Sequence, residues 1–279
     1  MILSDNEVTR FWRDGFLHKA KVIPAQVIDA VAADARRILP ADDLRHVNVP
    51  TPLGIRVARA MAASVAVART VTDPCLLTAI GQLVQSSVFV HPRWILRVSM
   101  PRVHGRFSMP PHQDFPFTQG ALDTITCWIP LHEVPEESSP LMFVARSHQR
   151  GLWPIDHTRQ RPVCDVSALD RVKWEVVPCA VGDIVLFHSL TVHASRRATD
   201  GLSRVSIDAR YQATHDHISP VELTPMTDMQ DVAVLQRDHG LAQRAADIGL
   251  RLRGPVPTDV LDVDLHESRL AERTTPREP

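Results

Sequence analysis

The sequence has 279 residues, enough for one large domain, and its 31 Lys and Arg nearly balance its 32 Asp and Glu, for a formal net charge of -1. This balance argues against a nucleic-acid or acidic-membrane partner, since both bind through an excess of basic side chains. No apolar window approaches the ~20 residues that span a bilayer, and the N-terminus lacks the basic and apolar regions of a signal peptide.

The N-terminal third of the chain is predicted to be mainly helical. Ser4 and Glu7 have the spacing of a capping box, which predicts a short helix to about Arg13. Gly15 and the two residues after it break this helix. A second helix is expected from Pro24, and residues 55–88 have mostly helical character.

From residue 93 the apolar spacing changes to a period of two, which is typical of strands. Because no long helices intervene, the strands predict an antiparallel sandwich or barrel. The predicted strands are 94–100, 124–131, 141–145, 173–178, 183–187 and 204–211.

The C-terminal part is predicted to return to helix, over residues 229–251, and to end in a loose tail of about a dozen residues. We therefore expect one domain, residues 1–279, in which a helical part (1–92) precedes a β core (93–214) and a helical extension (215–279). Four cysteines without a close pair fit a reducing compartment, so the expected location is the cytoplasm. The sequence leaves open whether the chain is a monomer or a homodimer.

A histidine and an aspartate two positions apart form a candidate metal-binding pair. His112 is the only one of the 14 histidines that is followed two positions later by an acidic residue, Asp114. In an extended segment residues i and i+2 point the same way, so both side chains can reach one ion. His193 is the candidate third ligand. Two histidines and one carboxylate form the facial triad of non-haem Fe(II) oxygenases, although zinc enzymes use the same ligand types.

The predicted strand 204–211 has one polar and one apolar face. Period two places four polar side chains on one side: Arg204, Ser206, Asp208 and Arg210. A polar inner face suits a ligand cavity, where a guanidinium group can hold a carboxylate through two hydrogen bonds. An exposed edge strand with its charges in water would give the same pattern.

The order and spacing of these residues resemble the phytanoyl-CoA 2-hydroxylase family of Fe(II)/2-oxoglutarate dioxygenases, over roughly residues 4–211. The resemblance implies a mainly β protein with flanking helices and a double-stranded β-helix core, which is a jelly-roll or cupin-like barrel. The matching segments are Arg13-Asp14-Gly15-Phe16, His112-Gln113-Asp114, Trp128, Pro130-Leu131, and Gly182-Asp183 leading through His188 to His193, Ser195 and Arg204.

The resemblance also implies roles for single residues. His112, Asp114 and His193 would bind Fe(II), and Arg204 would bind the distal carboxylate of 2-oxoglutarate. The cosubstrate pocket would also include Ser195, Trp128 and Thr126. The alternative for Trp128 is a core position without a ligand contact.

Two loops depart from the family pattern. Ser138-Ser139-Pro140 stands where Asn-Gly is common, and Ala145-Arg146-Ser147-His148 stands where Pro-Gly-Ser-His is common. Both concern turns, so they bear on the substrate side rather than on the metal ligands. His148 is interpreted as structural.

The implied reaction consumes 2-oxoglutarate and O2, releases succinate and CO2, and oxidises a small organic substrate. Related halogenases have a small residue in place of the carboxylate, so Asp114 favours hydroxylation of an unactivated C–H bond. Desaturation, cyclisation and epimerisation stay open. The candidate substrate residues are Arg97, Arg102, Phe115 and Phe117, and the arginines favour an anionic or natural-product-type substrate, although charges in solvated loops would look the same.

Two other classes of protein remain possible on these residues. A non-oxidative metalloenzyme on a cupin-like barrel would keep the three ligands without needing Arg204 as a carboxylate anchor. A binding protein without activity would keep the fold without needing the triad.

Overall fold

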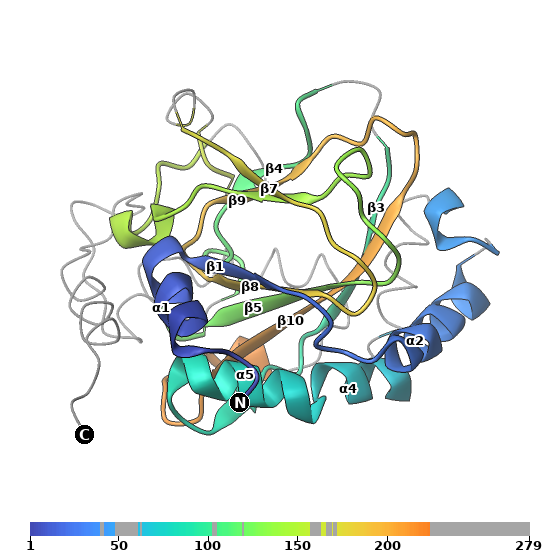
Figure 1. Cartoon of the computed structure of the whole chain (residues 1–279). Coiled ribbons are helices and arrows are strands. Elements are labelled where there is room, and N and C mark those ends of the chain that lie inside the picture. The colour runs from blue at the N-terminus through green and yellow to red at the C-terminus, as the bar shows by residue number, and fades with distance from the viewer. Residues whose placement is uncertain are drawn as a thin grey trace.

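The computed structural model describes residues 1–39, 42–47, 61, 63–101, 105–118, 120–156, 163–165, 169 and 172–223. Two antiparallel sheets face each other, and helices cover the outer face of the larger one (Figure 1). This is the antiparallel arrangement that the strand pattern predicts, and it has the double-stranded β-helix core with flanking helices that the family resemblance implies. The expected helix 229–251, the tail and Arg102 lie outside the described residues.

The larger sheet has six strands in the order β1-β8-β5-β10-β2, with β3 also paired to β10, and the smaller has four in the order β4-β9-β6-β7. Every pairing is antiparallel. The strands are β1 (Phe16–Lys19), β2 (Val88–Val90), β3 (Ile95–Ser99), β4 (Phe107–His112), β5 (Ile125–Pro130), β6 (Leu141–Phe143), β7 (Glu175–Val177), β8 (Ile184–His188), β9 (His193–Arg196) and β10 (Arg204–Ala213).

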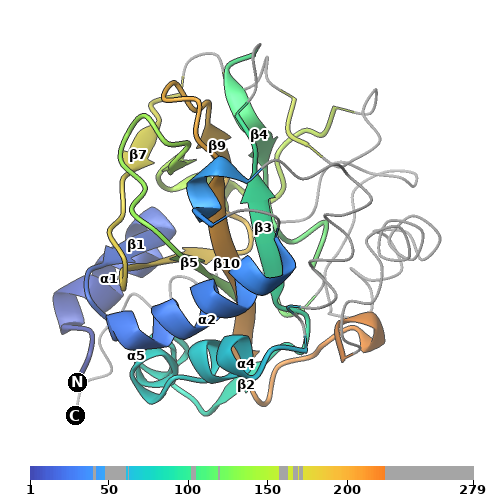
Figure 2. The same ribbon diagram turned by 90° about the vertical axis from the view of Figure 1, so that its right-hand side faces the viewer.

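The helices gather on one side of the six-stranded sheet, as Figures 1 and 2 show from two directions. Their apolar side chains and the outward side chains of β5, β8 and β10 form one core cluster, which includes Ile28, Ile80, Cys127 and Ile207. Within the described residues, no helix is long and apolar enough to cross a membrane. The helical elements are α1 (Asp5–Asp14), α2 (Ala25–Ile38), α4 (Val65–Val71), α5 (Pro74–Val84) and the 3-10 turns η1 (Leu44–His46), η2 (Ser147–Arg150) and η4 (Pro220–Leu223).

The first helix ends at Gly15, whose backbone contacts the loop between β8 and β9. The predicted capping box is present at its start, where the Ser4 side chain and Glu7 satisfy each other's backbone N–H groups. At its end Gly15 has φ +86°, and a Cβ there would lie 2.4 Å from His148 Nδ1. The Gly15 carbonyl accepts hydrogen bonds from His188 N (2.9 Å) and Thr191 Oγ1 (2.7 Å). This glycine therefore holds the loop between β8 and β9.

Several short strands differ from the sequence prediction. Residues 15–17 were expected only to break a helix, but Phe16–Lys19 forms β1 and pairs with β8 at the sheet edge. Strands β2, β4 and β9 were not predicted either. β4 contains Pro110 and Pro111 and pairs with β9 through register shifts, so it lacks the regular alternation by which strands are recognised.

Candidate metal centre and cosubstrate pocket

The two candidate histidine ligands lie side by side on adjacent strands of the smaller sheet. His112 ends β4, His193 begins β9, and the two residues are register partners with ring centroids 4.2 Å apart. His112 Nδ1 donates to the Pro110 carbonyl (2.9 Å), and His193 Nδ1 donates to the Thr191 carbonyl (3.0 Å). Because each Nδ1 carries its proton, each Nε2 presents a lone pair to the same point.

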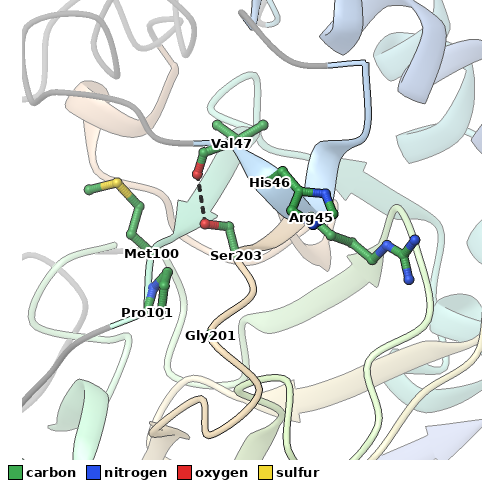
Figure 3. Close-up of a pocket in the computed structure, with 7 residues that line it drawn as sticks. All are labelled: Arg45, His46, Val47, Met100, Pro101, Gly201 and Ser203. Atoms are coloured by element: carbon green, nitrogen blue, oxygen red, sulfur yellow. Dashed lines mark hydrogen bonds between the residues drawn. The ribbon is translucent and has the colours of Figure 1, made fainter.

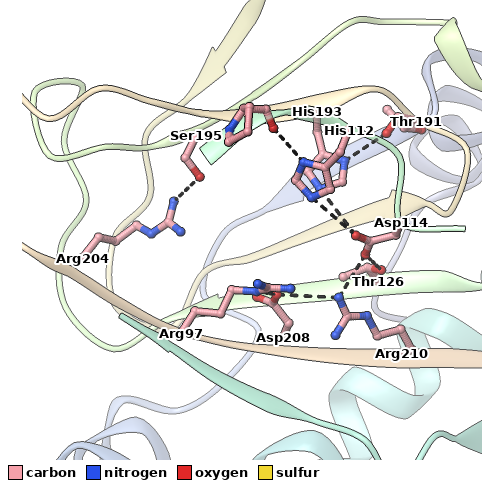
Figure 4. A network of polar contacts seen from close by, with 11 residues as sticks. Arg97, His112, Asp114, Thr126, Thr191, His193, Ser195, Arg204, Asp208 and Arg210 are labelled. Carbon is pink, nitrogen blue, oxygen red and sulfur yellow. Dashed lines mark hydrogen bonds and ion pairs between the residues drawn. The ribbon is translucent and has the colours of Figure 1, made fainter. Parts of the chain in front are cut away.

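Asp114 completes the group from the loop after β4 (Figure 4). Its Oδ1 lies 3.8 Å from His112 Nε2 and 3.7 Å from His193 Nε2. The other oxygen, Oδ2, accepts hydrogen bonds from Thr126 Oγ1 (2.6 Å) and Arg210 Nη2 (3.1 Å). The ligand atoms of the three residues all lie within 4.8 Å of one another, and all three residues are buried. The structure thus brings the three predicted ligands together.

The protonation states suit metal binding. Burial, together with repulsion from His193, lowers the pKa of His112 to about 3, and burial lowers the pKa of His193. Burial by itself would raise the pKa of Asp114, but Arg210, the two imidazoles and the Thr126 hydrogen bond outweigh it and hold the pKa below its usual range. Two neutral imidazoles and one carboxylate are therefore ready at neutral pH, and this donor set fits Fe(II) with three positions left open.

Arg204 lies at the other end of the inner face of β10. Its Nη1 donates to the Ser139 carbonyl (2.8 Å) and to Ser195 Oγ (3.0 Å), and its guanidinium group lies over the Trp128 ring. Burial lowers its pKa to about 10, an effect that Asp208 partly offsets, so the group stays charged at neutral pH.

Unsatisfied polar atoms next to this arginine fit an incoming carboxylate. Within the described residues, Arg204 Nε, Trp128 Nε1 and Ser206 Oγ are buried and have no hydrogen-bond partner. Buried donors without a partner are costly, so such atoms mark a place that a ligand or ordered water fills. The arrangement suits 2-oxoglutarate, whose distal carboxylate would meet Arg204 while its other end reaches the metal centre.

The remaining predicted residues fall into different places. The hydroxyl group of Thr126 is bonded to Asp114, so its contact is with a metal ligand. Arg97 on β3 forms an ion pair with Asp208 on β10 through Nε. Phe117 is half-buried and meets the His112 ring edge-on, with centroids 5.6 Å apart, and Phe115 is fully buried.

Sequence reasoning missed the polar contacts behind the metal ligands. Arg210 and Asp208 were placed on the inner face of the strand, but no role was assigned to them. In the structure Arg210 bonds Asp114 and lies 3.7 Å from Asp208, which also binds Arg97. The alternation of polar and apolar residues along β10 was the available signal. It predicted which side chains point inward but not which residues they contact.

Both departures from the family's glycine pattern fall at left-handed backbone positions. Ser139 has φ +62° and Arg146 has φ +64°. Non-glycine residues adopt this region at a cost of about 1–2 kcal/mol. Ser139 also supplies the carbonyl that holds Arg204, so the changed turn touches the predicted cosubstrate pocket. His148 is fully buried and bonds the Trp12 carbonyl (3.0 Å), in line with a structural role.

A second group of potential ligand atoms is committed to the fold. His18, Cys179 and Asp183 also lie within 4.8 Å of one another. However, both oxygens of Asp183 already accept hydrogen bonds, from Lys21 N, Ala180 N and His18 Nε2. This carboxylate therefore stabilises the turn before β8 and has little capacity left for an ion.

A surface depression of about 370 Å³ lies near the end of β3 (Figure 3). Arg45, Met100 and Ser203 contribute to its lining, and Ser203 Oγ donates to the Val47 carbonyl (2.7 Å). None of the candidate metal or cosubstrate residues lines it. We therefore place the chemistry inside the barrel.

Comparison with known proteins gives the same picture. The family model described as phytanoyl-CoA dioxygenase (PhyH) matches residues 11–206. A methylphosphonate hydroxylase from Gimesia maris is 26% identical over 204 residues, which cover 69% of this chain and 74% of the relative. An ectoine dioxygenase from Bordetella bronchiseptica is 25% identical over 245 residues, covering 78% of each.

A solved structure with the same fold is the epimerase SnoN from nogalamycin biosynthesis, in complex with Fe3+, α-ketoglutarate and nogalamycin RO. It superposes with a TM-score of 0.60 at 23% identity, covering 77% of this chain and 86% of SnoN. The family match covers more than half of the chain, including the His112, Asp114 and His193 group. This chain belongs to the phytanoyl-CoA dioxygenase (PhyH) family of Fe(II)/2-oxoglutarate-dependent oxygenases.

Proposed function

We propose that this chain is a hydroxylase that binds Fe(II) through His112, Asp114 and His193 and inserts oxygen into an unactivated C–H bond of a small organic substrate, with release of succinate and CO2. The observation that carries the proposal is Asp114, whose Oδ1 faces both Nε2 atoms. With a carboxylate in this place, no ligand position is set aside for a halide. Bound iron, supplied with 2-oxoglutarate and O2, provides the oxidising power for C–H cleavage.

The protein's own contribution is binding, orientation and exclusion of water. Arg204 anchors the distal carboxylate of the cosubstrate, with Ser195 and Trp128 beside it. The two imidazoles are held in one tautomer by backbone carbonyls. The three ligands are no more than 5% exposed, which shields the reacting centre from bulk water.

The substrate is proposed to carry an anionic group that Arg97 recognises. Arg97 binds Asp208 through Nε alone. Among the described residues, the two terminal nitrogens of Arg97 have no partner. The side chain is 30% exposed, so part of it is accessible to a ligand. Burial by itself would lower the pKa of Arg97, but Asp208 raises it above its usual value, so the ion pair stabilises the charged guanidinium group. The relative named methylphosphonate hydroxylase acts, by its name, on a small anion.

The alternative within the same chemistry is epimerisation, because SnoN has this fold. Product mass separates the outcomes: hydroxylation adds one oxygen atom, desaturation or cyclisation removes two hydrogens, and epimerisation leaves the mass unchanged. The substrate panel is small phosphonates and carboxylates, each offered with Fe(II), 2-oxoglutarate and O2.

The first experiment tests the cosubstrate. Anaerobic protein is mixed with Fe(II) and 2-oxoglutarate, and the weak visible charge-transfer band of the chelate is recorded for wild type, His193→Ala and Arg204→Ala. The proposal expects a band in wild type, no band in the histidine variant, and a higher 2-oxoglutarate requirement in the arginine variant. Metal binding without a band would point to the non-oxidative metalloenzyme, and absence of metal binding to a protein without activity.

A further inference from the structure

The two oxygens of the Asp114 carboxylate have different surroundings. Oδ1 faces His112 Nε2 and His193 Nε2. Oδ2 accepts one hydrogen bond from Thr126 Oγ1 and one from Arg210 Nη2, at 2.6 and 3.1 Å. A carboxylate oxygen with two strong donors is poorly placed to bind a metal ion as well. Only Oδ1 is left for the ion.

The two donors belong together in the fold. Thr126 on β5 and Arg210 on β10 are direct register partners, and both side chains point into the barrel. They lie on the six-stranded sheet, whereas His112 and His193 belong to the four-stranded sheet. These two contacts, drawn in Figure 4, therefore hold the Asp114 carboxylate against the six-stranded sheet.

Arg210 is itself held in place by charge. It is 3% exposed, and its Nη2 lies 3.7 Å from Asp208 Oδ2. Asp208 in turn pairs with Arg97, so charges alternate in sign along the inner face from Arg97 to Asp114. Removing Arg210 would leave two buried carboxylates without their shared cation, which disfavours the ordered arrangement.

We propose that Arg210, together with Thr126, is a positioning residue that makes Asp114 a one-oxygen ligand and so keeps metal positions open for the cosubstrate and O2. This role rests on the proposed function, because it requires a metal at the triad. Outer contacts of this kind typically change metal affinity by about 10- to 100-fold. The hydroxyl of Thr126 and the guanidinium of Arg210 act through Asp114 and touch no reacting atom.

The test measures Co(II) binding to the folded protein by calorimetry and by visible absorption, which reports coordination geometry. Thr126→Val and Arg210→Gln should each raise the Kd for Co(II) by about 10- to 100-fold. Both should also change the absorption of bound Co(II), because a freed Oδ2 can join the coordination. Thr126→Ser, which keeps the hydroxyl group, should stay close to wild type in both measurements.

Arg93→Gln is the matched control. Arg93 is also a buried arginine next to a buried carboxylate, 3.5 Å from Glu222; its charge repels that of Arg210, but among the contacts of the described residues none joins Arg93 to Asp114. Its Co(II) affinity and spectrum should equal those of wild type. Circular dichroism of the metal-free variants verifies folding, and Thr126→Val carries the test if Arg210→Gln fails to fold.

The outcomes separate this role from the proposed function. If wild type binds Co(II) and the folded Thr126→Val and Arg210→Gln variants bind it with unchanged affinity and spectrum, the positioning role is overturned and the function stands. If wild type binds no Co(II), the proposed function fails and this role fails with it.

Discussion

The guanidinium carbon of Arg204 lies 5.3 Å from the centroid of the Trp128 ring. Neither Arg204 Nε nor Trp128 Nε1 has a hydrogen-bond partner among the described residues. Arg204 is thus fixed on one side by Ser139 and Ser195 and stacked on an aromatic ring, while its remaining edge is unused. This geometry supports the proposal that Arg204 binds a carboxylate.

Arg204→Ala should raise the 2-oxoglutarate concentration needed for half-maximal chelate formation by about 10- to 100-fold, the effect of losing charge-assisted hydrogen bonds of about 1.5–3 kcal/mol. Metal affinity should not change, because Arg204 makes no contact with the three ligands. Titration of the anaerobic Fe(II) protein with 2-oxoglutarate measures the first effect and calorimetry the second. Equal 2-oxoglutarate affinity in variant and wild type would show that Arg204 does not bind the cosubstrate.

His112→Ala should abolish stoichiometric metal binding, because one of the two facing Nε2 atoms is lost. His18→Ala is the control: it disrupts the other group of potential ligand atoms, whose carboxylate is already saturated by hydrogen bonds. Metal analysis after loading and desalting gives the stoichiometry. Loss of metal in His18→Ala with retention in His112→Ala would show that the metal binds at His18, Cys179 and Asp183 instead.

Metal uptake at about pH 6 should release few protons, well under about one per site. A histidine with the ordinary pKa of 6.5 is mostly protonated at that pH and must lose its proton to bind a metal, but burial lowers the pKa of His112 to about 3 and also that of His193. Asp114 is ionised there as well, since its pKa is also lowered.

Calorimetry with Zn(II) in two buffers of different ionisation enthalpy measures this release. An observed enthalpy that is the same in both buffers is the expected result. Release of more than about one proton would mean that the imidazoles are exposed and protonated before the metal arrives.

Arg146→Gly should stabilise the protein by about 0.5–1 kcal/mol, because glycine relieves the left-handed backbone but adds freedom to the unfolded chain. The Arg146 side chain is exposed and φ is +64°, so little else is lost. Arg150→Gly nearby should destabilise, because φ is not positive there and the substitution also removes the guanidinium group from the Trp153 ring. Urea unfolding of the two variants provides the comparison, and a destabilised Arg146→Gly would show that the side chain matters more than the backbone.

Local sequence patterns determined much of the secondary structure. The capping box at Ser4, the helix after Pro24 and the alternation of 204–211 depend on neighbours a few residues apart, and the structure has all three. The order of the motifs along the chain also indicated the family and, through the family, the barrel fold. Strands β1 (Phe-Leu-His-Lys) and β9 (His-Ala-Ser-Arg) were missed because their residues do not alternate between apolar and polar, and their pairing partners lie far away in the chain.

Only the tertiary structure decided which polar side chains meet. The alternation of β10 places Asp208 and Arg210 inside the barrel, but the register with β5 puts Arg210 opposite Thr126 and both against Asp114. The pairing of Arg97 with Asp208 likewise depends on the register between β3 and β10. A register shift of one residue would turn every one of these side chains to the other face, and what prevents it is the packing of the apolar face on the helices, a long-range property that no short segment contains.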